Sequence, residues 1–228
     1  MKIFNKEFKL KTLIYWLLSF LPENVHSTID ILRRYSYWKK EKTIFIHIPK
    51  SAGISVNQAI YGRPLGHFYA KDIIGIYPKI FKKFFTFSVV RNPIDRLYSA
   101  YHFSIQGGTN VMGMKNYEYY INNQDFNSFE SFVTKWLKKQ NLLKIDFIFR
   151  PQYVYLFDDN KKLLVDKFYK LEHIEEYFDE ISNAIGKPFS LEHLNASKRG
   201  KVKITDELRN EICNIYKQDF KLLGYSLD

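Results

Sequence analysis

The chain has 228 residues, of which 46% are hydrophobic, so it is long enough to bury a core and needs no second domain. Its formal net charge of +11 favours an anionic partner, such as a nucleotide, a nucleic acid, an acidic glycan or a membrane surface, without choosing among them. The single cysteine, Cys213, excludes an internal disulfide, fits a reducing compartment and is expected in the core.

Residues 1–42 are predicted to form an N-terminal helical arm that precedes one domain over residues 43–228. The arm contains an apolar run from Leu13 to Leu21, which is too short to span a bilayer. The run is not followed by the small-residue cleavage site of a signal peptide, so we expect a helix there. Packing of this helix on the domain is favoured, and a peripheral contact with a membrane surface is the alternative.

A buried strand, a short basic loop and the start of a helix are predicted over residues 43–59, in the sequence TIFIHIPKSAGISVNQA. The apolar run is typical of a strand covered on both faces in a parallel sheet, and Pro49 ends it. The free N–H groups and the positive end of the helix dipole form an anion cradle in such a unit, and Lys50 adds a full charge. His47 alternates with apolar residues in the strand and is interpreted as structural.

A second strand, turn and helix are predicted over residues 84–103, in the sequence FFTFSVVRNPIDRLYSAYHF. Asn92 can cap this helix, and Pro93 suits its first position. Arg91 is then left at the C-terminal end of the strand, which is the edge where open α/β sheets bind ligands. If the two strands are neighbours, Arg91 and the Lys50 loop lie on one crevice.

Ser99 lies two helical turns after Asn92, on the same helix face. The planar guanidinium of an arginine such as Arg91 suits binding of phosphate oxygens in pairs, whereas a structural arginine at a strand end would usually pair with a carboxylate. Arg96, one turn into the helix, is interpreted as an ordinary salt-bridging residue.

The remaining chain alternates irregular and periodic segments. Residues 104–125 interleave tyrosines with polar groups, which suits stacking on a sugar. The other elements expected are, in chain order, a helix from Lys71, a helix after an Asn127–Glu130 capping pair with an apolar stripe to Leu137, a strand over residues 163–169, a helix over residues 172–185 ending at Gly186, and a closing helix with an apolar face from Leu208 to Phe220.

Several of these stretches resemble the PAPS-dependent carbohydrate sulfotransferases, where PAPS is 3′-phosphoadenosine-5′-phosphosulfate. The string PKSAGIS resembles the PK(T/S)(A/G)G(T/S)S loop that holds the donor's 5′-phosphosulfate. The string VRNPIDRLYSAYHF resembles the segment that grips the 3′-phosphate, whose arginine and serine fall eight positions apart, as Arg91 and Ser99 do. GHFYA, residues 66–70, resembles the GHxxA stretch of the bacterial and polysaccharide branch, and within the family the chain is similar to heparan sulfate 2-O-sulfotransferases.

The resemblance covers about residues 43 to 226, through the ending IYKQDFKLLGY. It implies a P-loop-like α/β fold, a three-layer sandwich with a central, mostly parallel sheet. It also implies transfer of a sulfuryl group from PAPS to a hydroxyl of a saccharide or glycolipid, with PAP as the product and with neither a metal nor a nucleic acid. We expect a bacterial, cytoplasmic enzyme, with association at the inner face of a membrane left open.

The matching motifs also imply roles for individual residues. Lys50 is expected to stabilise the bridging oxygen of the leaving phosphate, and His67 to take the acceptor's proton. His102 and Gln152 are candidate acceptor-binding residues, together with His67. The candidate donor-binding residues are Lys50, Ser51, Ala52, Gly53, Ile54 and Ser55 in the first loop, Arg91 and Ser99 in the second motif, and Lys198 and Arg199 after an N-x-S sequence similar to the family's C-terminal loop.

Three alternatives stay open. His67 is equally well explained as a turn histidine satisfied by backbone contacts, with a carboxylate as the base, as in some branches of the family. A P-loop nucleotide phosphotransferase shares the strand–loop–helix arrangement, but the GxxxxGK[ST] spacing that it needs is missing. A non-enzymatic protein that binds anionic glycans would account for the charge without chemistry.

Overall fold

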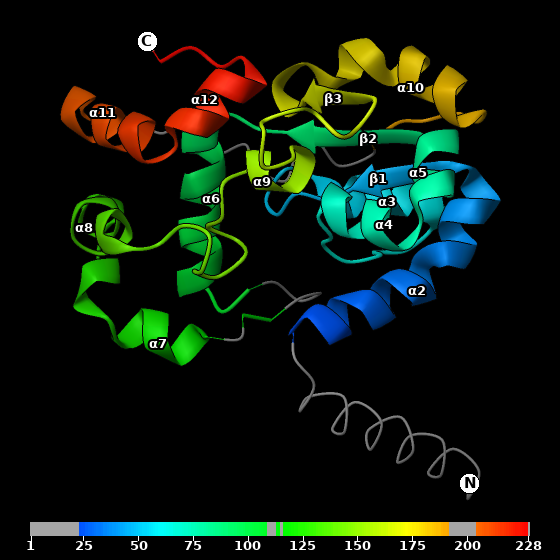
Figure 1. The fold of residues 1–228 in the computed structure, drawn as a ribbon. Helices are drawn as coiled ribbons and strands as arrows, with labels where there is room; N and C mark the ends of the chain where they lie inside the picture. The colour runs from blue at the N-terminus through cyan, green and yellow to red at the C-terminus, as the bar shows by residue number, and fades with distance from the viewer. Residues whose placement is uncertain (1–22, 109–112, 115, 192–203, 228) are drawn as a thin grey trace, which may run out of the picture.

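The computed structural model of the chain describes residues 23–108, 113–114, 116–191 and 204–227. At the centre of this part lies a sheet of three parallel strands, β1 (Thr43–Ile46), β2 (Phe85–Val90) and β3 (Lys167–Lys170), in that order (Figure 1). Thr43 pairs with Phe85 on one side of β2, and Phe87 pairs with Lys167 on the other. The predicted α/β class with a parallel sheet is therefore confirmed.

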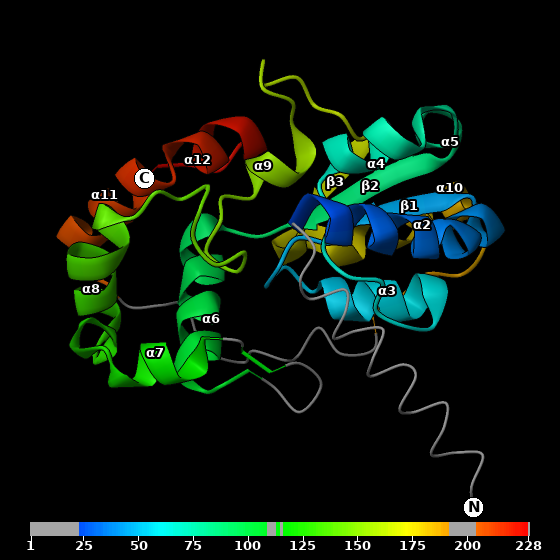
Figure 2. The same ribbon diagram turned by 60° about the horizontal axis from the view of Figure 1, so that its bottom comes forward.

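Helices cover both faces of the sheet. Every residue of β1 is buried, and so are all residues of β2 after the first. Helix α3 (Gly53–Tyr61) lies on one face, and α4 (Ala70–Ile76) and α5 (Pro78–Lys83) lie on the other (Figure 2). Burial on two faces explains why these strands read as continuous apolar runs in the sequence.

Helix α2 (Glu23–Glu41) packs along the outer edge of β1, in contact with α3 and α4. Its Ile31 and Trp38 are buried in the same core as the strands. Lys187 Nζ lies 2.5 Å from Glu41 Oε2, which ties the end of α2 to a distant loop. This part of the predicted arm is thus packed on the core, whereas the apolar run from Leu13 to Leu21 lies outside the described residues. None of the described helices is long and apolar enough to cross a membrane.

The buried hydrophobic side chains form two clusters, one around the sheet and one around α6 (Pro93–Ile105). We call the parts of the molecule that they stabilise the sheet lobe and the helical lobe. Besides α6, the helical lobe contains α7 (Tyr117–Asn122), α8 (Phe129–Ser131), α11 (Asp206–Ile215) and α12 (Lys217–Leu223). Cys213 is buried in α11, as predicted, and this burial raises the pKa of its thiol. In Figures 1 and 2, α6 stands between the sheet and helices α8 and α11.

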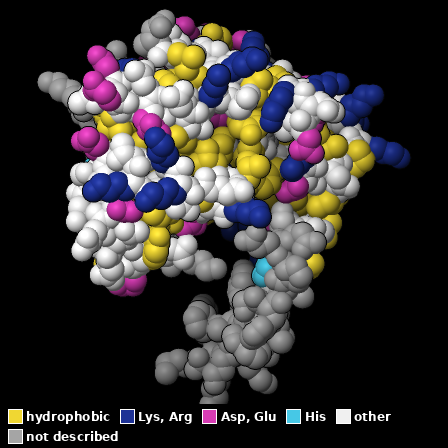
Figure 3. Space-filling view, turned by 60° about the vertical axis from the view of Figure 1, so that its left-hand side comes forward, with side chains coloured by type: hydrophobic (Ala, Val, Ile, Leu, Met, Phe, Trp, Pro, Cys, Tyr) yellow, Lys and Arg dark blue, Asp and Glu magenta, His cyan; other side chains and the backbone are white. Residues whose placement is uncertain are grey.

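Figure 3 shows the side of the molecule on which the helical lobe lies. Hydrophobic side chains gather in the middle of this face, and Lys and Arg side chains interleave with Asp and Glu around them. On this face, the positive charge is therefore dispersed among acidic groups.

The predicted helix through residues 129–137 is broken in the structure. Ser128, and not Asn127, caps its start, because the Ser128 hydroxyl accepts a hydrogen bond from the Ser131 N–H at 3.0 Å. The helix then continues as a π-helical segment η2 (Phe132–Trp136) and a 3₁₀ turn η3 (Leu137–Lys139). The apolar stripe is nevertheless buried, with Phe132 and Val133 fully enclosed.

The elements after residue 150 are shorter than predicted. A short helix α9 (Tyr153–Leu156) precedes β3, and β3 does not include Leu163, which bridges to Phe157 instead. The predicted helix over residues 172–185 divides into the 3₁₀ segment η4 (Leu171–Tyr177), which is kinked at His173, and α10 (Phe178–Ile185), whose N-cap residue is Tyr177. Gly186 ends α10 with φ of +72°, as predicted for a C-terminal glycine.

Candidate active site

The two predicted motifs meet at one edge of the sheet. Because β1 and β2 are parallel neighbours, their C-terminal ends lie side by side. The Lys50 loop, residues 47–52, follows β1, and Arg91 follows β2. The condition for Arg91 and the Lys50 loop to share one site, that their two strands are neighbours, is therefore met. β1 itself ends at Ile46, earlier than predicted, and Pro49 lies in the turn after it.

The backbone of the Lys50 loop is shaped to receive an anion. Lys50 and Ala52 have φ values of +68° and +58°, in the left-handed region, and left-handed residues in such loops turn successive N–H groups toward one point. Ala52 is the N-cap residue of α3, and no side chain caps the helix. The first helical hydrogen bond runs from the Val56 N–H to the Ala52 carbonyl at 3.2 Å, so the preceding N–H groups lack a helical acceptor. Phosphate oxygens would complete this uncapped helix start.

Gly53 has a steric role that its sequence context did not reveal. A Cβ built at Gly53 would lie 1.7 Å from Cδ2 of His47, so the imidazole occupies the space that any side chain would need. The His47 ring is itself buried, and its burial lowers its pKa well below 6.5, which keeps it neutral. His47 is thus a structural residue, as the sequence indicated, and its ring packs against Gly53 at the start of α3.

The Gly53→Ala variant is expected to destabilise the fold, because overpacking a closed site typically costs about 1 to 3 kcal/mol. Gly75→Ala, in α4, is the matched control, since a Cβ there meets nothing within 4 Å. Chemical denaturation of both variants checks this expectation. A Gly53→Ala protein as stable as the Gly75→Ala protein would show that the His47 ring does not fill this space.

The side chain of Lys50 reaches across to the helical lobe. Its Nζ lies 4.2 Å from the centroid of the Phe103 ring, which α6 supplies. A cation over an aromatic face is held electrostatically, so this contact directs the ammonium group toward α6. Ser51 is fully buried behind it, whereas Ser55 is partly exposed at the start of α3.

Arg91 and Ser99 are positioned by the second motif. The Asn92 Oδ1 accepts hydrogen bonds from the N–H groups of Ile94 at 3.0 Å and Asp95 at 3.4 Å, so Asn92 caps α6 as predicted. Burial lowers the pKa of the Arg91 guanidinium, and the nearby carboxylates, Asp95 foremost, oppose that shift. Ser99 follows two turns into α6 and is partly exposed.

Gln152 clamps the two motifs together. Its Oε1 accepts hydrogen bonds from the Arg91 N–H at 2.9 Å and the Ser51 hydroxyl at 3.3 Å, and its Nε2 donates to the Arg91 carbonyl at 2.7 Å. Gln152 was predicted to contact the acceptor. Because it is fully buried and both ends of its amide are engaged, we interpret it as a positioning residue instead.

Two further buried charges hold this clamp. The carboxylate of Asp219 accepts hydrogen bonds from the N–H groups of Gln152 and Tyr153, each at 2.8 Å, and burial raises its pKa. Arg96 was expected to form a surface salt bridge, but it is buried and donates to the carbonyls of Pro49, Ile148 and Arg150. Arg96 is buried because α6 carries it inward behind the Lys50 loop.

His67 lies beside the Lys50 loop, with its Nδ1 3.0 Å from the carbonyl oxygen of His47. A carbonyl only accepts hydrogen bonds, so Nδ1 carries the proton and Nε2 carries the lone pair. The centroid of the imidazole ring lies 4.0 Å from that of His47 and 5.1 Å from that of Phe147. Burial lowers the pKa of His67, and the charge of Lys50 lowers it further. The backbone contact that is expected of a turn histidine is therefore present. It also leaves Nε2 unprotonated, as a general base requires.

The other predicted site residues are placed as follows. His102 lies one turn after Ser99 on α6, with its ring 4.4 Å from Tyr98 and 5.2 Å from Tyr101. Lys198 and Arg199 lie outside the described residues, so their predicted role in closing over the donor stays a prediction.

Arg96, Asp219 and Phe147 are parts of this site that were not predicted from the sequence. Asp219 left a signal, because it stands on the apolar face formed by Ile212, Tyr216 and Phe220, where a carboxylate needs partners. Arg96 and Phe147 left none, because an arginine one turn into a helix and a phenylalanine before an apolar run are ordinary in sequence.

Comparison with known families identifies the class of protein. The model of the Sulfotransferase family matches residues 68–226, which is more than half of the chain, and the chain therefore belongs to this family. It is accordingly an enzyme that transfers a sulfuryl group. The matched range includes Arg91, Ser99 and Gln152, whereas the Lys50 loop and His67 precede it. Searches of curated proteins and of solved structures gave no match.

Proposed function

We propose that the enzyme transfers the sulfuryl group of PAPS to a hydroxyl of a saccharide or glycolipid. The observation that carries the proposal is the clamp of Gln152 on Ser51 and Arg91, which fixes an uncapped helix start and an arginine at one sheet edge. PAPS has anionic groups at both its 5′ and 3′ positions, and two separate anion sites at a fixed spacing suit such a donor.

In this proposal, the residues divide the work of an in-line transfer. His67 Nε2 accepts the proton of the acceptor hydroxyl as its oxygen bonds to sulfur and the bond from sulfur to the 5′-phosphate oxygen breaks. Lys50 and the N–H groups at the start of α3 stabilise the negative charge that grows on that phosphate oxygen. Arg91 and Ser99 bind the 3′-phosphate and thereby hold the donor in line. The negative charge on the leaving phosphate is thus stabilised by groups of the protein chain.

The GHFYA sequence supports placement in the bacterial polysaccharide branch of the family, with heparan sulfate 2-O-sulfotransferases as the type of enzyme to compare. His67 in this sequence stands beside the Lys50 loop, where an acceptor hydroxyl would need a base. These features fit a cytoplasmic enzyme at the inner face of a membrane. Its acceptors would be cell-surface polysaccharide, lipopolysaccharide or glycolipid precursors.

The donor assignment predicts that PAP binds more tightly than AMP, because only PAP carries a 3′-phosphate. Arg91→Ala should remove most of this preference, since a hydrogen bond to a charged group contributes about 1.5 to 3 kcal/mol. Calorimetric titration of both nucleotides measures it. Arg63→Ala is the control, because Arg63 bonds to Tyr37 on the exposed surface, away from the sheet edge. Equal affinities of the unaltered protein for PAP and AMP would refute the donor assignment.

A further inference from the structure

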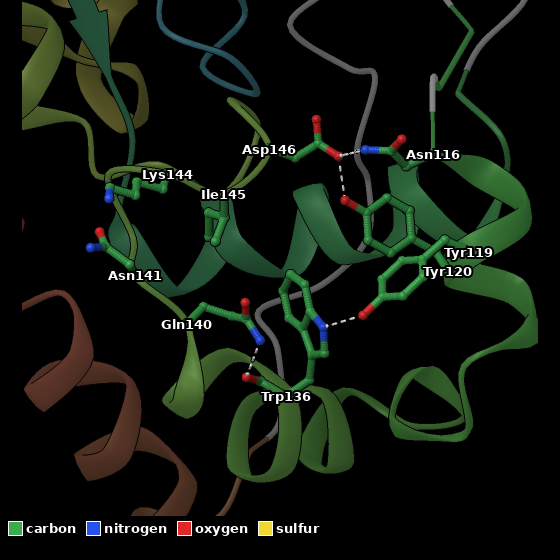
Figure 4. Close-up of a pocket in the computed structure, with 9 residues that line it drawn as sticks. All are labelled: Asn116, Tyr119, Tyr120, Trp136, Gln140, Asn141, Lys144, Ile145 and Asp146. Atoms are coloured by element: carbon green, nitrogen blue, oxygen red, sulfur yellow. Dashed lines mark hydrogen bonds between the residues drawn. The ribbon is translucent and has the colours of Figure 1, made fainter.

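We propose that a cavity in the helical lobe binds a sugar unit of the acceptor chain, an inference that rests on the proposed function for the identity of the acceptor. The cavity has a volume of about 490 Å³ and lies between α7, η2 and the segment of residues 140–146 (Figure 4). Its size is within the range of roughly 300 to 1,000 Å³ that is typical of small-molecule sites.

Tyr119 forms a rigid aromatic platform at this cavity. The residue is 53% exposed, yet its hydroxyl accepts a hydrogen bond from Trp136 Nε1 at 2.9 Å (Figure 4) and another from Asn123 Nδ2 at 3.2 Å. An exposed tyrosine usually keeps its hydroxyl in water and its ring free to move. The two donors hold this ring in one orientation, so stacking of a sugar on it costs little conformational entropy.

Asp146 supplies a carboxylate to the same cavity. Its Oδ2 accepts hydrogen bonds from Asn116 Nδ2 at 2.7 Å and from the Tyr120 hydroxyl, as Figure 4 shows. Burial and the charge of Asp146 raise the pKa of Tyr120, which therefore remains a donor. Among the described residues, none donates to the other oxygen, Oδ1. A carboxylate oxygen fixed in this way is a suitable acceptor for sugar hydroxyls.

Three more polar side chains complete the lining. Gln140 uses its Nε2 to donate to the Trp136 carbonyl at 3.2 Å, and Asn141 uses its Oδ1 to accept from the Leu143 N–H at 3.0 Å. The opposite ends of both amides remain as an acceptor and a donor, and Lys144 adds a positive charge. An aromatic face surrounded by acceptors, donors and one cation matches a pyranose ring, and the cation favours a uronic acid.

The cavity is connected to the candidate active site by one segment of chain. Phe147, directly after Asp146, has its ring 5.1 Å from the ring of His67. Arg150 Nε donates to the carbonyl of Ile145 at 2.8 Å, which fixes the cavity wall to the residues that precede Gln152. The wall of the cavity is thus continuous in sequence with a side chain that contacts His67, and we infer that a saccharide chain with one sugar in the cavity extends toward His67.

The test is direct binding in the absence of donor, measured by calorimetry or by ligand-observed NMR. The probes are two hexasaccharides, one of alternating glucuronate and N-acetylglucosamine and one of N-acetylglucosamine alone. We expect Tyr119→Ala to weaken binding of the charged hexasaccharide by about three- to tenfold, the contribution of one aromatic contact. Ile121→Ala, on the same helix and 42% exposed, is the matched control and should bind as the unaltered protein does. Lys144→Ala should reduce the preference for the charged probe.

Two outcomes would overturn the sugar site. One is equal affinity of the Tyr119→Ala and Ile121→Ala proteins for the charged hexasaccharide, and the other is no binding of either probe to the unaltered protein. Neither outcome affects the donor assignment, because PAP binding is measured separately and involves residues at the sheet edge. Conversely, sugar binding without any preference for PAP over AMP would retain the sugar site and refute the donor.

Discussion

Lys50→Ala is expected to lower kcat by about 10² to 10³-fold, the usual cost of removing one group that stabilises charge in a transition state. Lys50 lies in a loop of left-handed backbone before α3, and its ammonium group lies over the Phe103 ring of α6. Negative charge grows on the phosphate oxygen only as the sulfuryl group leaves. The loss should therefore appear in kcat more than in the affinity for PAP.

Lys50→Met is the better controlled variant, because methionine keeps an apolar contact with the Phe103 ring and removes only the charge. Steady-state kinetics and calorimetry on both variants separate catalysis from docking. If kcat is unchanged and PAP binding is weakened, Lys50 serves to dock the donor and the assigned catalytic role is wrong.

His67→Ala is expected to lower turnover by roughly 10²-fold or more, which is typical for the loss of a positioned general base. PAP affinity should remain nearly intact. The pH profile gives the sharper signature, because only the neutral imidazole accepts a proton. Burial and Lys50 lower the pKa of His67, so the acidic limb of the unaltered enzyme should have its midpoint below pH 6.5. The variant should lose this limb, as rates measured from pH 5 to 8 would show.

The competing explanation assigns the base to a carboxylate and leaves His67 to hold its turn through the bond to the His47 carbonyl. In that case, His67→Ala would lower thermal stability while the folded enzyme kept near-normal turnover and the same acidic limb. His173→Ala is the control, since this exposed histidine lies outside the site, with its Nδ1 3.1 Å from Glu176 Oε1.

The parts of the site that the sequence predicted are those that local chemistry determines. Arg91, Asn92 and Pro93 each have a positional preference at the junction of a strand and a helix, and the structure places all three as expected. The same holds for the apolar strands and for Gly186 at the end of α10. Such preferences act within a few residues, so a single sequence carries them.

The parts that the sequence did not predict depend on contacts between distant segments. Gln152 meets Arg91 across 61 positions, and Asp219 meets Gln152 across 67. Local pattern does not specify such pairings, and Gln152 was accordingly assigned to the acceptor. The break at His173 and the bridge of Leu163 to Phe157 are likewise set by tertiary packing, which overrides the helix and strand propensities of those segments.

Transfer of radioactive sulfur from PAPS to a saccharide is the most direct test of the proposed reaction. The purified chain is incubated with PAPS labelled in its sulfur and with a panel of cell-surface polysaccharides and glycolipids, and in parallel with ATP labelled in its γ-phosphate. We expect label from PAPS to appear on a saccharide acceptor, PAP to be released in equal amount, and Lys50→Ala to abolish nearly all of this transfer. Transfer of label from ATP and none from PAPS would contradict the proposed reaction and would point to the nucleotide phosphotransferase instead.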